Sequence, residues 1–345
     1  MKRRHYFSTA LLMFVLFASF LQFGSLTDIQ YTDKTYHVSA QTASSPIIID
    51  SEDDFSTLGI AGSGSLEDPY LIQGLLFESL SNDSCISICH VNSYVLITDC
   101  VFSFSNPSGR AINLYNGSNC MIIDCDFSCD GTALFIDRYQ LCYADAIDCQ
   151  TSRIYASNSN SVILSNCSLE NVPDDAIALT KCTFSQITNC SISGCTASGI
   201  AFYGTNYSSV MSNIIQGADL YSIILIEGSS YNFIIGNFIY SAGVASAYDG
   251  GLENDWDDGD RKGNWWEDYS GEGVYIINGP GLVYDRFPNV ISLPTTPNTN
   301  EIFISLETWE APDFNTRVLT TLGVVATFAL LILVVFYIRF KLVKL

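Results

Sequence analysis

The stretch Ile187-Thr188-Asn189-Cys190-Ser191-Ile192 contains the pattern that decides the fold of this chain. An apolar residue is followed three positions later by Cys or Asn, and five positions later by a second apolar residue. The pattern occurs seven times, around Cys100, Cys125, Cys149, Cys167, Cys190, Asn213 and Asn237, in steps of 25, 24, 18, 23, 23 and 24 residues. The copy around Cys149 is the weakest, because it ends at Thr151. Such a period indicates a stacked repeat, in which each unit needs its neighbours to bury its apolar face.

Each repeat is predicted to consist of at least two short strands joined by tight turns. Apolar and polar residues tend to alternate within the copies, which is the period of a strand. A second strand pattern opens most units, as in Ala133-Leu134-Phe135-Ile136, and turn residues such as Asn106-Pro107-Ser108-Gly109 fill the gaps. No amphipathic helix fits, and the spacing of a leucine-rich repeat is absent. We therefore expect an all-β fold, a parallel β-helix over residues 46–290 with one coil per repeat.

The Cys and Asn positions of the pattern should form a ladder inside this β-helix, because equivalent positions of successive coils lie above each other. An inward Asn can satisfy buried backbone groups with hydrogen bonds, and a Cys fills similar space as a small apolar residue. We interpret the five Cys of the ladder as core packing. A redox or soft-metal role is the alternative, although CxxC and His spacings typical of metal sites are absent.

The two ends of the chain predict export and membrane anchoring. Residues 1–26 combine a basic start with an apolar run, which is the pattern of a signal peptide, with an uncleaved anchor as the alternative. Residues 318–338 carry no charge over 21 positions and predict a C-terminal transmembrane helix. Residues 27–45 form a spacer and residues 291–317 a Pro- and Thr-containing stalk. The positive-inside rule places the tail, 339–345, in the cytoplasm and the β-helix outside the cell membrane.

The part predicted to lie outside the cell is strongly acidic. Residues 46–317 contain 34 Asp and Glu against eight Lys and Arg, a formal charge of 8 − 34 = −26. This charge argues against nucleic-acid binding, because phosphates require a basic face. An acidic surface suits solubility, cation-rich surroundings or a cationic partner.

Export also permits disulfides and glycans. The chain has twelve Cys, whose connectivity the sequence does not reveal. Five Asn-x-Ser sequons make the chain a candidate glycoprotein, at Asn82, Asn116, Asn166, Asn189 and Asn206. Asn166 and Asn189 lie beside the ladder, so a glycan there requires that they face outward.

Three segments carry a resemblance to a known family: residues 62–74 (GSGSLEDPYLIQG), the repeats, and the closing segments 254–259 (NDWDDG), 263–269 (GNWWEDY) and 285–288 (DRFP). Together they resemble the right-handed parallel β-helix superfamily of carbohydrate-binding and sugar-hydrolase domains, and within it the NosD-like group. The resemblance covers about residues 47–290. It implies a right-handed coil and only weakly a function, since one fold hosts many activities.

The closing segment is interpreted as a cap. Trp256, Trp265, Trp266 and Tyr269 could cover the open edge of the last coil. The functional alternative is a ligand-binding platform, in which Trp265, Trp266 and Tyr269 stack against sugar rings.

A calcium loop is a further candidate in the same segment. Its ligands would be Asp255, Asp257, Asp258 and Asp260, because hard cations take carboxylate oxygens. The full EF-hand pattern is absent.

One motif suggests catalysis. Asp174-Asp175-Ala176-Ile177 resembles the paired-Asp motif of β-helix polygalacturonases, in which carboxylates act as acid and base. The companion motifs of that family are missing, and Asp-Asp is also an ordinary turn. A lyase site built on Arg110, Arg138 and Arg153 is a weaker alternative.

The leading hypothesis is therefore a non-catalytic surface module that binds a polysaccharide or a surface protein. A polysaccharide hydrolase, lyase or epimerase is the first alternative. A metal-handling accessory protein, as the NosD-like resemblance implies, is the second, although the predicted extracellular part has only Met121, Met211, His90 and His37 for soft-metal transfer.

Overall fold

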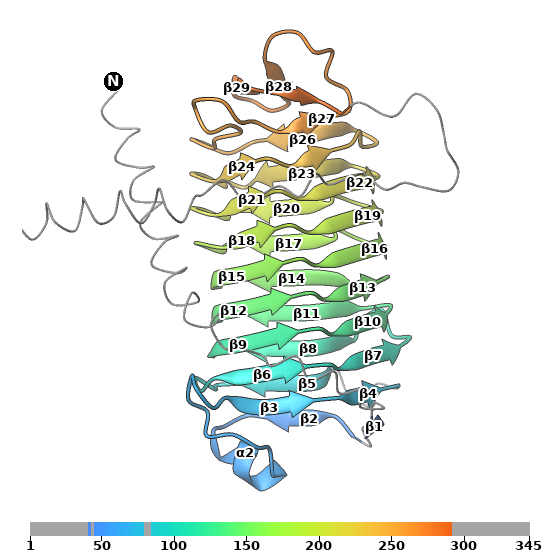
Figure 1. Cartoon of the computed structure of the whole chain (residues 1–345), viewed down its shortest axis with the longest axis vertical. Helices are drawn as coiled ribbons and strands as arrows, with labels where there is room; N and C mark the ends of the chain where they lie inside the picture. The colour runs from blue at the N-terminus through green and yellow to red at the C-terminus, as the bar shows by residue number, and fades with distance from the viewer. Residues whose placement is uncertain (1–40, 43–44, 79–83, 292–345) are drawn as a thin grey trace, which may run out of the picture. The chain divides into compact units, whose positions relative to one another are not determined.

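The computed structural model describes residues 41–42, 45–78 and 84–291, and these residues form a parallel β-solenoid (Figure 1). The expected all-β parallel coil is thereby confirmed. The predicted signal peptide 1–26, most of the stalk 291–317, the transmembrane helix 318–338 and the tail 339–345 lie outside the described residues. Within the described ranges, no helix has the length and apolarity needed to cross a bilayer.

Three parallel sheets form the walls of the solenoid. Sheet A contains β1 (Gln41–Thr42), β4 (Leu75–Phe77), β7 (Val101–Phe104), β10 (Asp126–Cys129), β13 (Asp148–Gln150), β16 (Ser168–Val172), β19 (Ser191–Cys195), β22 (Ile214–Ala218), β25 (Phe238–Ile239), β27 (Trp265–Trp266) and β30 (Asn289–Val290). Sheet B contains β2 (Ile47–Ile49), β5 (Ser84–Cys89), β8 (Arg110–Tyr115), β11 (Thr132–Asp137), β14 (Arg153–Ser157), β17 (Ile177–Thr180), β20 (Ile200–Tyr203), β23 (Tyr221–Ile226) and β26 (Ala245–Asp249). Sheet C contains β3 (Tyr70–Gln73), β6 (Val95–Thr98), β9 (Ser118–Ile123), β12 (Gln140–Asp145), β15 (Asn160–Ser165), β18 (Gln186–Thr188), β21 (Ser209–Met211) and β24 (Phe233–Ile235).

Each coil passes through sheets B, C and A in turn, as β8, β9 and β10 do. A typical repeat therefore has three strands, one more than the minimum read from its sequence. Strands pair in parallel with those of the next coil in nearly constant register, so that Phe127 pairs with Phe102 on one side and Cys149 on the other. Sheet B has nine strands, one for each coil.

The core runs along the inside of the three sheets, because side chains alternate between the two faces of each strand. In β11, Leu134 and Ile136 are buried, whereas Phe135 between them points outward. Like residues stack on like: the rings of Phe77, Phe102 and Phe127 lie parallel, with centroids 5.1 and 4.8 Å apart. This apolar column continues from coil to coil and stabilises the stack by burial.

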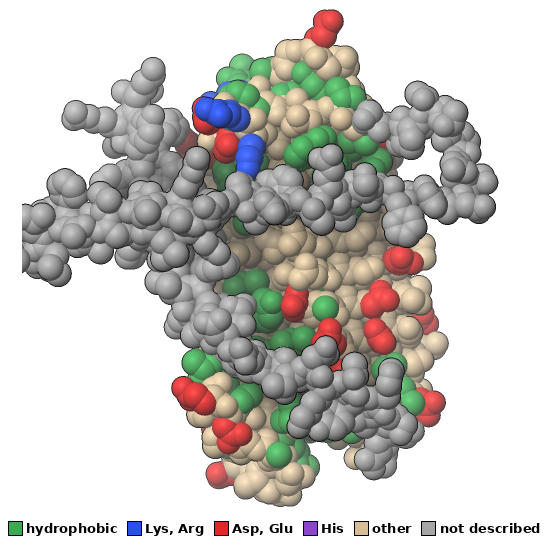
Figure 2. Space-filling view, viewed as in Figure 1, with side chains coloured by type: hydrophobic (Ala, Val, Ile, Leu, Met, Phe, Trp, Pro, Cys, Tyr) green, Lys and Arg blue, Asp and Glu red, His purple; other side chains and the backbone are tan. Residues whose placement is uncertain are grey.

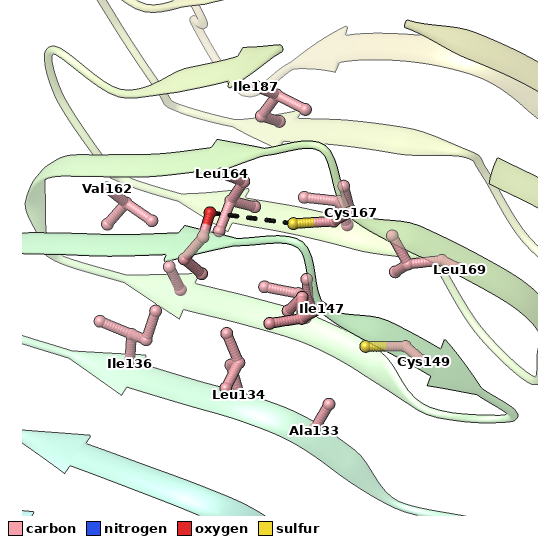
Figure 3. Close-up of a cluster of buried hydrophobic side chains, with 14 of the residues drawn as sticks. Ala133, Leu134, Ile136, Ile147, Cys149, Val162, Leu164, Cys167, Leu169 and Ile187 are labelled. Atoms are coloured by element: carbon pink, nitrogen blue, oxygen red, sulfur yellow. Dashed lines mark hydrogen bonds between the residues drawn. The ribbon is translucent and has the colours of Figure 1, made fainter. Parts of the chain in front are cut away.

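The Cys ladder is present, but its third member is Ile147 and not Cys149. Cys100, Cys125, Ile147 and Cys167 each directly precede a strand of sheet A, and their carbonyl groups accept hydrogen bonds from the next coil at matching positions. Cys149 instead pairs in register with Leu169, inside the strand. Figure 3 shows Ile147 in line with Cys167, and Cys149 in line with Leu169. The prediction was wrong by two residues because the two coils on either side of Ile147, 22 residues from Cys125 and 20 residues to Cys167, are shorter than the coils of 25 and 23 residues next to them.

The Asn part of the ladder is longer than predicted, since Asn264 follows Asn213 and Asn237. The Asn237 side-chain oxygen accepts hydrogen bonds from the backbone and side-chain nitrogens of Asn213, at 3.0 and 2.9 Å. The Asn237 side-chain nitrogen donates to Asn264 Oδ1 and to the Val210 carbonyl, both at 2.9 Å. All three Asn are buried. The ladder thus satisfies the polar groups of a turn that water does not reach.

All twelve Cys are free thiols, and eleven of them are buried while Cys89 is half-buried. Packing therefore accounts for their positions.

Among the sequons, Asn116, Asn166 and Asn189 are exposed, so the outward orientation that a glycan requires is present at these three. Asn206 is half-buried, and Asn82 lies outside the described residues.

Both ends of the solenoid are covered. At the first coil, the short helix α2 (Asp53–Leu58) buries Phe55, whose ring stacks on Tyr70 at 3.8 Å. At the other end, Trp256 and Trp266 are buried in the core beneath the antiparallel pair β28 (Tyr275–Ile277) and β29 (Val283–Asp285). The predicted cap of Trp256, Trp265, Trp266 and Tyr269 stays a prediction, to which the burial of Trp256 and Trp266 contributes.

Candidate functional site

Basic side chains are concentrated on the outer face of sheet B. The described residues include seven Lys and Arg, and four of these lie on or directly beside sheet B: Arg110, Arg138, Arg153 and Lys181. In the view of Figure 2, Lys and Arg side chains appear only near the C-terminal end of the solenoid, while acidic side chains spread over the middle coils. The cations of the middle coils are thus gathered on one face of an acidic solenoid.

Two of these arginines share one row. Arg110 opens β8 and Arg153 opens β14, and both pair in register with Thr132 of the strand between them. They are two strand spacings apart, which corresponds to about 10 Å along the solenoid. Arg138 and Lys181 follow the opposite ends of β11 and β17. The three arginines predicted to share a face therefore do so, but Arg138 lies across the sheet from the other two.

Aromatic rings lie next to the arginine row. Phe135 and Tyr155 point outward from β11 and β14, and their rings stack with centroids 5.4 Å apart. The guanidinium carbon of Arg110 lies 3.5 Å from the centre of the Phe135 ring, and that of Arg153 lies 5.5 Å from the centre of the Tyr155 ring. These are cation–π contacts, which hold the guanidinium groups in place. We call Arg110, Phe135, Arg153 and Tyr155 the arginine–aromatic row.

The predicted catalytic pair, Asp174 and Asp175, lies beside this row in the turn between β16 and β17. Asp174 forms an ion pair with Arg153, and its other oxygen accepts a hydrogen bond from the Asp175 amide at 2.9 Å. Asp175 is buried and accepts hydrogen bonds from the Ser198 amide at 2.8 Å and the Tyr203 hydroxyl at 2.6 Å. Burial, followed by the hydrogen bond to Asp175, raises the pKa of Tyr203 above its ordinary value. Both carboxylates thus connect coils of the solenoid.

The predicted ligand platform in the closing segment is divided between the inside and the outside. Trp266 is fully buried, and its indole nitrogen donates to Asp285 at 3.0 Å. The inclusion of Trp266 in an exposed platform is therefore corrected. Trp265 is half-buried and points outward from sheet A, where it stacks on Phe238 at 4.7 Å. Tyr269 is also half-buried, and its hydroxyl donates to the Gly273 carbonyl at 2.6 Å.

The four predicted calcium ligands point to different partners. Asp257 is buried and forms an ion pair with Arg286, while Asp260 lies 3.3 Å from Arg261. Asp258 accepts hydrogen bonds from the amides of residues 260, 261 and 262 at 2.7–2.9 Å. Burial acts to raise the pKa of Asp258, but these amides outweigh it and leave that pKa below its ordinary value.

Asp255, the fourth candidate, is exposed, and its backbone continues the coil contact with Asn232. Within 45–78 and 84–291, no three His, Cys, Asp or Glu side chains come together in a group that could hold a metal ion. Calcium binding by Asp255, Asp257, Asp258 and Asp260 stays a prediction, and the contacts of these residues give it no support.

The comparison with protein families is consistent with this geometry. The model of the right-handed beta helix region matches residues 79–239 and 142–283, which together span more than half of the chain. The chain belongs to the right-handed beta helix family. No curated protein matches the chain. Membership of this family establishes the fold, whereas an activity has to be argued from the site.

The aromatic half of the row was not recognised from the sequence. Phe135 lies within the strand pattern Ala133-Leu134-Phe135-Ile136, and strict alternation from the buried Leu134 and Ile136 would have placed it outside. The outward position of Phe135 was therefore predictable from the sequence. Its contact with Arg110, 25 residues earlier in the chain, was not predictable.

Proposed function

We propose that this chain is an exported, membrane-anchored β-helix module whose sheet B face binds a polysaccharide without cleaving it. The observation that supports the proposal is the arginine–aromatic row, an outward strip of stacked rings and guanidinium groups along successive coils. Aromatic faces pack against the apolar faces of sugar rings, and guanidinium groups donate hydrogen bonds to hydroxyl and carboxylate oxygens. Because the coils repeat in register, the row can contact several units of one extended polymer.

The contacts of Asp174 and Asp175 favour binding over turnover. A general acid or base must reach the substrate with a carboxyl group that is available for proton transfer. Asp174 is occupied by Arg153, and Asp175 is buried under the Tyr203 hydroxyl. Their arrangement supports the interpretation of this motif as a structural turn.

Anchoring in the cell membrane is part of the proposal and rests on the sequence of residues 1–26 and 318–338. A single span would hold the β-helix outside the cell and the short tail in the cytoplasm. The finer assignment to the NosD-like group rests on the opening and closing segments. A surface protein is the alternative ligand, since Arg and aromatic residues also mark protein interfaces.

Binding is tested with the full-length chain, purified in mild detergent and applied to a glycan array with calcium present. We expect reproducible binding to one polysaccharide class, which the double variant Phe135→Ala/Tyr155→Ala loses at least tenfold. The matched control is Phe184→Ala/Tyr207→Ala, which removes another outward pair of stacked rings, 5.5 Å apart, at a turn between sheets B and C. A silent array, or equal loss in both double variants, would refute the sheet B site.

Catalysis is tested on the same polysaccharide. We expect no release of new reducing ends and no unsaturated product from the wild-type chain. Turnover that is lost in Asp174→Asn/Asp175→Asn, with binding retained, would show that the module is an enzyme.

Membrane fractionation of the full chain and of a chain ending at residue 317 tests the anchor. We expect only the full chain to sediment with membranes.

A further inference from the structure

We infer that Arg110 is a recognition site for an anionic group, so that the polysaccharide bound by sheet B is an acidic one. This inference rests on the proposed function and names the chemical class of its ligand. It starts from the partners of the arginines. Arg138, Arg153, Arg261 and Arg286 each have a carboxylate within ion-pair distance. In the described part of the chain, Arg110 has none.

An arginine without a carboxylate partner is unexpected in this protein. Residues 46–317 contain more than four acidic residues for every basic one, 34 against eight. The other four described arginines each have a carboxylate neighbour. Among the described residues, the neighbours that Arg110 contacts or pairs with are neutral: Asn113, Phe135, Thr132 and Ser84. Its charge therefore stays available to a ligand.

Arg110 is also held in a fixed position. The carbon of its guanidinium group lies over the Phe135 ring, 3.5 Å from the ring centre. One of its nitrogens, Nη1, donates to Asn113 Oδ1 at 2.9 Å, and the Asn113 side-chain nitrogen in turn donates to Ser87 Oγ at 3.0 Å. A guanidinium group has five N–H donors, and only Nη1 makes a hydrogen bond within the described residues. The remaining donors can bind a carboxylate or sulfate in a two-pronged contact.

Arg153 provides a second position of opposite character. It lies in the same row, about 10 Å from Arg110, but Asp174 neutralises it. An acidic group of the ligand at this position has to compete with Asp174. Removal of the Asp174 charge should therefore strengthen the binding of an acidic polymer. A catalytic role for Asp174 predicts only a loss of function in the same variant.

The experiment measures binding of the full-length chain, in mild detergent, to matched pairs of probes. Polygalacturonate is compared with its methyl ester, which removes the charge from the same backbone. Chondroitin and chondroitin sulfate distinguish a carboxylate from a sulfate. We expect Arg110→Gln to weaken binding of the charged forms at least tenfold and to leave the methyl ester unchanged. We expect Asp174→Asn to strengthen binding of the charged forms several-fold.

Two further variants control the interpretation. Arg110→Lys keeps the charge but loses the two-pronged geometry, and we expect it to bind between wild type and Arg110→Gln. Arg261→Gln removes an exposed cation of the cap and should bind as wild type does. Circular dichroism and thermal melting of each variant verify that the solenoid is folded.

The possible failures separate the two proposals. Equal binding of charged and methyl-esterified forms, unchanged in Arg110→Gln, would overturn the anionic site and leave polysaccharide binding intact. Equal loss of both forms in a folded Arg110→Gln variant would also overturn it, because Arg110 would then only shape the face. Binding to polyglutamate but to none of the glycans, or to nothing, would overturn both proposals.

Discussion

The guanidinium group of Arg153 forms an ion pair with the carboxylate of Asp174. The two residues are 21 positions apart in the sequence and lie on adjacent coils. The pair closes the turn before β17 against the start of β14. It links the arginine–aromatic row to the motif that resembles a catalytic pair. Asp174 thus has a partner within the solenoid, as Asp175 has in the Ser198 amide and the Tyr203 hydroxyl.

The first prediction compares this ion pair with that of Arg286 and Asp257. The side chains of Arg153 and Asp174 are 32% and 47% exposed, whereas Asp257 is only 2% exposed. Asp174→Asn should therefore lower the free energy of unfolding by no more than about 1 kcal/mol. Asp257→Ala leaves the amides of Gly259 and Arg286 without their buried acceptor and should lower it by more, about 2–3 kcal/mol, since the Arg286 side chain itself is 46% exposed. Urea denaturation of both variants measures this, and equal effects would contradict the prediction.

The second prediction concerns the Asn ladder. Asn237→Ala removes the acceptor of two hydrogen bonds from Asn213 and the donor to the buried Val210 carbonyl. Unsatisfied buried groups cost about 1–3 kcal/mol each, so we expect a loss of at least about 2 kcal/mol. Cys190→Ala is the control in the same ladder, since it removes only weak thiol hydrogen bonds to the Thr188 and Leu164 carbonyls and leaves a small gap. The ladder would be less important than we argue if both variants unfolded at the same urea concentration.

The third prediction is a pH dependence at Asp124. Burial, and then the charges of Asp99 and Asp145, raise the pKa of Asp124 above 3.8. A carboxyl group with a raised folded pKa favours folding below its unfolded pKa, and this contribution is lost as the pH rises through the folded pKa. Asn166 and Asn189 occupy the equivalent turn position, with φ angles of 52° and 54° against 53° for Asp124. Asp124→Asn is therefore conformationally matched.

At pH 7 we expect Asp124→Asn to have a free energy of unfolding equal to or above that of wild type. The gain should not exceed about 0.5 kcal/mol, because the side chain is exposed. The difference should vanish below pH 3.8. Thermal melting between pH 3 and pH 8 measures it. A variant that is less stable than wild type at pH 7 would show that the Asp124 charge has a favourable partner.

The fourth prediction concerns the thiols. Burial raises the pKa of Cys142 to about 12, and burial followed by the charge of Cys129 raises that of Cys85 to about 12. Such thiols are not deprotonated near neutral pH and react slowly with alkylating reagents. We expect native labelling to modify Cys89 alone, and labelling in denaturant without reductant to modify all twelve. Mass spectrometry counts the labels. Fewer than twelve after unfolding would demonstrate disulfides in the protein as isolated.

Much of the fold was predictable from local features. The period of about 23 residues, the alternation within strands and the turn residues between them indicated a stacked all-β coil, because in-register pairing of successive coils requires a nearly constant repeat. The buried Cys and Asn positions were also visible as a recurring pattern. The misassignment of Cys149 for Ile147 shows the limit: turns absorb changes in coil length, so counting residues does not reveal which positions align.

The candidate site depended on that alignment. Arg110 and Arg153 were each visible in the sequence, but 43 residues separate them, and they share a row only because β8, β11 and β14 pair in register. The same pairing brings Phe135 under Arg110 and Asp174 against Arg153. The repeat period and the turn pattern depend only on the order of residues along the chain. The neighbours of an outward side chain depend on which coils stack and where each turn ends, and only the packed solenoid decides these.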